Sequence, residues 1–142
     1  MEDILDLLRE KAESVPVSLE LPDEDLLVEI EEELFLPLPD DLREYLLVAS
    51  DVVYGSLEPA TVTDPRSHTY LPEMAAVAWD QGLPRQHIPF CEFDGGWYYI
   101  TAAGSVHYWR NGRAKPHWDS LWHWISEVWL GNHEAPLPVT NT

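Results

Sequence analysis

The sequence holds little cysteine, little positive charge and no long apolar run, and each shortage excludes a class of protein. Cys91 is the single cysteine among 142 residues, so neither an intramolecular disulfide nor a four-cysteine zinc site can form. No apolar run approaches the roughly 18 residues that a membrane span needs. The first residues are acidic, where a secretory signal would be basic. We therefore expect a soluble, cytoplasmic protein, and 45% apolar residues are enough for a core.

Basic residues are scarce, and the charge is unevenly distributed. Eight Lys and Arg face 26 Asp and Glu, which gives a net charge of −18. Phosphate binding needs clustered Lys and Arg, so nucleic acid and anionic membranes are disfavoured as direct partners. Residues 1–58 hold 18 acidic and three basic residues, whereas all seven Trp lie between Trp79 and Trp129. The acidity serves either solubility or contact with a basic protein, and composition leaves both open.

Hydrophobic periodicity changes twice along the chain. It predicts helices over residues 2–13, 23–34, 40–49, 71–80 and 119–130. It predicts strands over residues 88–93, 97–101 and 105–110, and Asn111-Gly112 is a strong hairpin signal. We predict one α+β domain over residues 1–142, with an antiparallel β meander packed against N-terminal and C-terminal helices. Its core spans about residues 23–130, residues 1–22 form an extra helix and link, and residues 134–142 are a frayed tail.

Residues that could carry chemistry are present without the spacing that chemistry needs. The six histidines show no metal-binding pattern; they are His68, His87, His107, His117, His123 and His133. Cys91 lies among aromatic and acidic residues, which favours a buried core thiol over a reactive one. Ser105 follows Gly104 and is typical of a turn. We expect no catalytic residue, no cofactor and no metal.

The closing helix has a wide apolar arc at 100° per residue. One stripe contains Leu121, Trp124, Ile125 and Val128, and a second contains Trp118, Trp122 and Trp129. Together they span roughly 160°, more than the arc that docks on one core. The N-terminal helix covers part of the arc, or the arc is a contact surface. On the second interpretation, Trp122 and Trp129 are candidates for self-association as a homodimer or for a partner contact.

Several short motifs occur in an order that is typical of one family. In the helical part they are Ile30-Glu31-x-x-Leu34, Leu38-Pro39 and Tyr45-Leu46. In the aromatic part they are Ile88-Pro89-Phe90, Asp94-Gly95-Gly96, Trp97-Tyr98-Tyr99, Gly104-Ser105-Val106-His107-Tyr108-Trp109 and Ser120-Leu121-x-x-Trp124-Ile125. From about residue 23 to 130, the chain resembles the SUKH superfamily of bacterial immunity proteins and the fungal regulator of cell-wall assembly. The family's Asn-Gly-Gly after the second helix is missing from the segment 50–55. The helix over residues 2–13 lies outside the resemblance.

The resemblance implies an α+β domain that binds proteins and is not an enzyme. In bacteria it implies an immunity protein that blocks a toxin, often a nuclease. The charge agrees independently, because a nuclease that grips phosphates is basic and an acidic protein complements it. A regulatory or scaffold domain without a toxin is the alternative. An acidic hydrolase is a third class, for which no site is found.

The candidate contact residues are acidic and lie on the outward faces of two helices. The corner Leu36-Pro37-Leu38-Pro39 should bring these helices together and make one acidic patch. The candidates are Glu29, Glu32, Glu33, Asp40, Asp41 and Glu44. A basic protein toxin would relieve the repulsion among their carboxylates.

Overall fold

The structure is a computed structural model that describes residues 2–16 and 19–131. Its helices are α1 (Glu2–Lys11), α2 (Glu24–Leu34), α3 (Asp40–Val48), α4 (Leu71–Asp80) and α5 (Leu121–Trp124), the last continuing into the π-helix η1 (Ile125–Trp129). Its strands are β1 (Ile88–Phe93), β2 (Gly96–Ile100), β3 (Val106–Arg110) and β4 (Arg113–Trp118). The predicted α+β class is confirmed. The predicted frayed tail, residues 134–142, and His133 lie outside the described residues.

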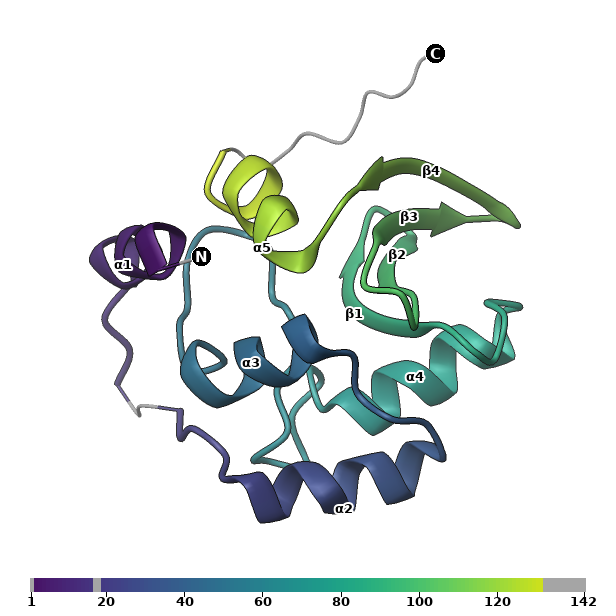
Figure 1. The fold of residues 1–142 in the computed structure, drawn as a ribbon, viewed down its shortest axis with the longest axis horizontal. Helices are drawn as coiled ribbons and strands as arrows, with labels where there is room; N and C mark the ends of the chain where they lie inside the picture. The colour runs from purple at the N-terminus through teal and green to yellow at the C-terminus, as the bar shows by residue number, and fades with distance from the viewer. Residues whose placement is uncertain (1, 17–18, 132–142) are drawn as a thin grey trace.

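The strands form one antiparallel sheet in the order β1-β2-β3-β4, a meander as predicted. β4 is a correction, because the sequence analysis found the hairpin signal Asn111-Gly112 and assigned no strand after it. The segment of β4 lacks apolar alternation and contains Pro116, which a sheet tolerates at its edge. β1 is the other edge and contains Pro89. Figure 1 shows the sheet to one side of the fold, with α4 beside β1.

α2 has clear signals at both ends. The Asp23 side chain accepts a hydrogen bond from the Leu26 backbone N–H at 2.9 Å, which caps the first turn. Leu27, Ile30 and Leu34 are buried, and they are the predicted apolar stripe. The helix stops at Phe35, whose backbone is left-handed with φ 58° and ψ 34°. In Figure 1, α2 runs along the lower edge of the fold.

The core beneath the sheet is aromatic. Tyr98 on β2 packs against Trp118 and Trp124, with ring centroids 5.8 and 5.0 Å apart. Phe90 on β1 meets Trp124 edge to face at 4.9 Å. Cys91 is fully buried as predicted, and this burial raises the pKa of its thiol. Among the residues described, no helix combines the length and the apolar character that crossing a membrane requires.

The closing helix differs from the regular helix that the sequence predicted. The Leu130 N–H donates to the Ile125 carbonyl at 2.8 Å, five residues back, so η1 is wound more loosely than an α-helix. Looser winding advances each residue by less than 100°, which turns Trp129 back towards the core. Trp118 lies on β4 rather than on the helix.

The two indoles proposed for self-association are covered by their own chain. Trp122 is 5% exposed and Trp129 is 2% exposed. The Trp129 Nε1–H donates to the Tyr54 carbonyl at 2.9 Å, and its ring meets Tyr45 of α3 edge to face. The prediction that these two indoles are exposed is therefore wrong, and for Trp129 the contacts with Tyr45 and Tyr54 account for the burial. Homodimerisation itself stays a prediction.

Candidate functional site

The Leu36–Pro39 corner joins α2 to α3, as the sequence predicted. The Leu38 backbone N–H donates to Glu31 Oε2 at 2.7 Å. Arg43 of α3 reaches back to α2, where its guanidinium pairs with Glu24 and, at 3.6 Å, with Glu31. Glu24 and Glu31 are seven residues apart, which places both on the flank of α2 that faces α3. Ion pairs therefore join this flank of α2 to α3, and we call the flank with Glu24, Glu31 and Arg43 the charge-paired seam.

The three α2 candidates lie away from that seam. Glu29 and Glu33 occupy the opposite flank, where the Tyr70 hydroxyl donates to Glu33 Oε1 at 3.1 Å. Burial of the phenol raises the pKa of Tyr70, and so do the hydrogen bond and charge of Glu33 and the charges of Glu29 and Glu73. Glu32 is exposed and lies opposite the buried stripe. The outer surface of α2 is thus a row of carboxylates.

The three α3 candidates divide between solvent and α5. Asp40 is exposed and Glu44 is half-buried. Asp41 Oδ2 accepts a hydrogen bond from the Leu121 backbone N–H at 3.2 Å, so it also holds the start of α5. The six candidates therefore form an outward row on α2 and a second group on α3, with Arg43 between the helices.

A groove of about 540 Å³ lies beside the second group. One wall is the corner over residues 37–41, and the other is the β2–β3 turn over residues 102–104 together with Asp119 and Ser120. Asp40, Asp41 and Asp119 bring three carboxylates to it, and its described lining contains no Lys or Arg. Such a groove suits a cationic side chain from another molecule.

Residues 1–130 match the model of the family SUKH_5, described as SMI1-KNR4 cell-wall. The chain belongs to this SUKH family. A crystal structure of a protein from Pseudomonas syringae pv. tomato is similar, with a TM-score of 0.90 and 54% identity over 93% of this chain and 100% of that chain. No curated protein matches.

Membership of the SUKH superfamily confirms the resemblance and extends it. The match begins at residue 1, so it includes α1, which the sequence analysis left outside. α1 is tied to the fold by Leu8, which is fully buried, and by Arg9, which pairs with Asp51 at 2.8 Å. Helix α1 is short, and its sequence contains none of the motifs that carry the resemblance.

Two parts of this SUKH surface were missed by sequence reasoning. Asp119 and the turn over residues 102–104 meet the corner of α2 and α3 only through the tertiary fold, and no local pattern announces this. Phe35 was also missed, although a signal was present. It follows the stripe residue Leu34 and so falls about 100° off the buried face.

The aromatic half of this SUKH domain carries a row of stacked rings across the sheet. His87 stacks on Tyr99 at 4.5 Å, Tyr99 on His107 at 5.3 Å, and His107 lies 5.0 Å from His117. The row follows the strand register, in which Tyr99 pairs with His107 and His107 with His117. Burial first, then the charges of His117 and His87, lower the pKa of His107.

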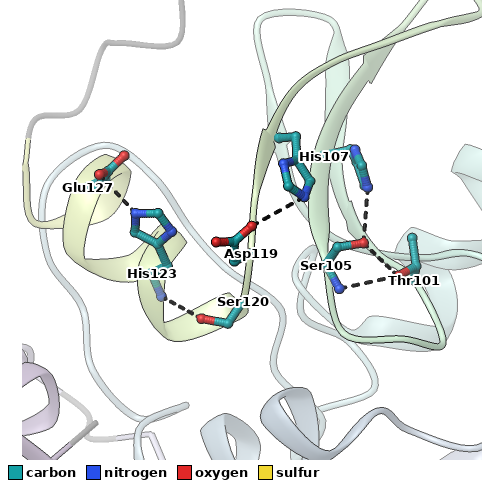
Figure 2. Close-up of polar contacts among 8 residues, drawn as sticks. Thr101, Ser105, His107, Asp119, Ser120, His123 and Glu127 are labelled. Carbon is teal, nitrogen blue, oxygen red and sulfur yellow. Dashed lines mark hydrogen bonds and ion pairs between the residues drawn. The ribbon is translucent and has the colours of Figure 1, made fainter.

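The polar contacts near this row hold turns and a helix start (Figure 2). Ser105 Oγ lies 3.1 Å from His107 Nε2 and 2.9 Å from Thr101 Oγ1, which closes the β2–β3 turn, the predicted place of Ser105. Asp119 pairs with His117 at 3.6 Å and has no described contact with His107. A serine nucleophile needs its histidine oriented by a third group, and this arrangement offers none within residues 2–16 and 19–131. The same residues contain no cluster of three or more metal-binding side chains.

We expect the histidine row to make the free energy of unfolding depend on pH. The lowered pKa of His107 means that the unfolded chain binds this proton more readily than the folded chain. Full stability therefore holds above the unfolded-state pKa near 6.5, and it is lost as pH falls through the folded-state pKa. We expect urea unfolding between pH 7.5 and pH 5 to show this loss, and His107→Phe to reduce it. His68→Gln is the control, because His68 lies beside Glu58 and outside the row. Equal losses in wild type and His107→Phe would contradict the assignment.

Proposed function

We propose that this SUKH protein is an immunity protein that binds a basic bacterial toxin and neutralises it in the cytoplasm without catalysis. The observation that carries the proposal is the acidic surface of α2 and α3. These two helices contain nine Asp and Glu and a single basic residue, Arg43. Arg43 is already engaged by Glu24 and Glu31, so it does little to offset the outward carboxylates.

Charge and ancestry support this function together. Carboxylates that lie close together, in the row on α2 and in the group on α3, repel each other in the free protein, and a basic partner relieves that repulsion. A nuclease toxin presents such a surface where it grips phosphates. The similarity to a protein from the bacterium Pseudomonas syringae supports the bacterial branch of the superfamily over the fungal one. The buried single thiol fits a reducing compartment.

The test takes any basic toxin domain encoded beside this gene and measures its association with wild type and with a charge variant of the α2 row. Glu29, Glu32 and Glu33 are changed together to Gln, which keeps the hydrogen-bond acceptor for Tyr70. Rim carboxylates act mainly on the encounter rate, so we expect association to slow by roughly tenfold at low salt. The difference should shrink as the Debye length falls toward about 8 Å at physiological ionic strength.

The control carries the same change in charge on another helix. Glu2, Asp6 and Glu10 are exposed residues of α1, and their amide variants should associate like wild type. A folded α2 variant that associates and protects as wild type would show that the toxin binds elsewhere. The absence of any basic toxin partner would favour the regulatory or scaffold alternative instead.

A further inference from the structure

Helix α2 ends at Phe35, whose backbone conformation is unfavourable for a residue with a side chain. The Leu36 N–H donates to the Glu31 carbonyl and the Phe35 N–H to the Glu32 carbonyl, both at 3.3 Å, which is the Schellman pattern of a helix terminus. The left-handed position in this pattern is usually glycine. Here it is Phe35, with φ 58°, and a side chain in this conformation crowds the following carbonyl. The chain therefore carries local strain at this point.

The Phe35 ring gains little within the chain to offset that strain. It is 83% exposed, the most exposed large apolar side chain among the described residues. Val28, two helical turns earlier on α2, is 47% exposed. Residues with a strained backbone cluster at binding sites. Large aromatic side chains contribute much of the binding energy at protein interfaces.

Acidic residues of α2 lie next to this apolar pair, and so does Arg85, whose Nη2 donates to the Leu34 carbonyl at 2.7 Å. Glu31 and Glu32 lie three and four residues after Val28, and four and three before Phe35, so they sit between the two on the helix surface. Glu32 is exposed, and Glu29 continues the row. An apolar centre within a charged rim is the usual anatomy of a protein interface. Glu31 is paired with Arg43, so Glu32 and Glu29 supply the negative charge of this rim, and the surface that complements them is positive.

We propose that Phe35, with Val28 beside it, is the apolar anchor by which this chain docks a basic protein. The phenyl ring enters an apolar pocket on the partner, and Lys or Arg around that pocket pair with Glu32 and Glu29. This rests on the proposed function and names the contact that holds the complex once charge has brought the two proteins together. The anchor acts on dissociation, whereas the rim acts on association.

Phe35→Gly separates a binding role from a structural one. Glycine relieves the left-handed strain, partly offset by its greater freedom in the unfolded chain, so Tm should rise by about 1–4 °C. The affinity for the toxin domain used in the test of the proposed function should fall at least tenfold, mainly through faster dissociation. Phe35→Asn, which tolerates the same backbone, should lose affinity equally. Val77→Ala is the matched control, since Val77 is 46% exposed on α4 and lies outside the proposed contact.

The outcomes of these experiments test the Phe35 anchor separately from the proposed function of toxin binding. A toxin that binds Phe35→Gly as tightly as wild type, while the Glu29, Glu32 and Glu33 variant binds more slowly, overturns the anchor and leaves the function standing. A fall in Tm for Phe35→Gly assigns the ring a structural role and also overturns the anchor. If no basic toxin partner exists, the proposed function fails and the anchor fails with it.

Discussion

Replacing Trp124 with alanine should lower the free energy of unfolding by about 3–5 kcal/mol. Trp124 is fully buried and lies where α5 meets the sheet, with Phe90 and Tyr98 packed against its ring at 4.9 and 5.0 Å. Phe90 and Tyr98 are held on the paired strands β1 and β2, so these two rings cannot collapse into the space of the indole, and a cavity remains. Urea unfolding monitored by circular dichroism measures the loss.

Trp124→Phe is the informative companion. It keeps a ring between Phe90 and Tyr98 and removes the indole N–H, which finds no acceptor in the part of the chain that the structure describes. The removed N–H was a buried unpaired donor, so its loss offsets part of the lost volume. We expect less than half the cost of Trp124→Ala. If both variants lost the same free energy of unfolding, the loss would not depend on the volume of the ring removed, and the prediction would be wrong.

Replacing Gly96 with alanine should destabilise the fold by about 3 kcal/mol, at the upper end of the usual cost of overpacking. A Cβ at Gly96 would stand 2.5 Å from the Trp109 carbonyl oxygen and 2.6 Å from the Tyr108 hydroxyl. The Tyr108 hydroxyl is itself fixed, since it donates to the Phe93 carbonyl at 2.6 Å. The β2–β3 pair must therefore separate to admit one methyl group.

The neighbouring glycine provides the control. Gly95 has φ +77° and open space around its missing Cβ, so Gly95→Asn suits a backbone that Asn tolerates. We expect its midpoint of urea unfolding to stay close to that of wild type. A Gly96→Ala protein as stable as Gly95→Asn would contradict the close approach of β3 to β2.

Local signals predicted most elements of this fold because they act within a few residues. The α2 stripe of Leu27, Ile30 and Leu34 and the Asp94-Gly95-Gly96 turn are examples, and both are where the sequence put them. β4 was missed because an edge strand with a proline shows neither alternation nor a continuous apolar run. The π-turn of η1 was missed because a wheel drawn at 100° per residue assumes regular winding.

The surface was harder to predict than the fold. The sequence identified the acidic helices and their corner, yet the separation of Glu33 from Asp41 depends on Tyr70 and Leu121, partners 37 and 80 residues away. Phe35 shows a different limit. Its place after the stripe indicated exposure, but only its left-handed backbone reveals that the exposure comes with strain.

The prolines at both edges of the sheet bear on how this protein behaves at high concentration. Pro89 in β1 and Pro116 in β4 lack the N–H that a strand from another molecule would need for pairing. The Phe90 carbonyl of β1 is also occupied, because the Ala60 N–H donates to it at 2.7 Å. Neither margin offers a full ladder of hydrogen bonds, so copies of the chain are discouraged from adding to one another as a growing sheet.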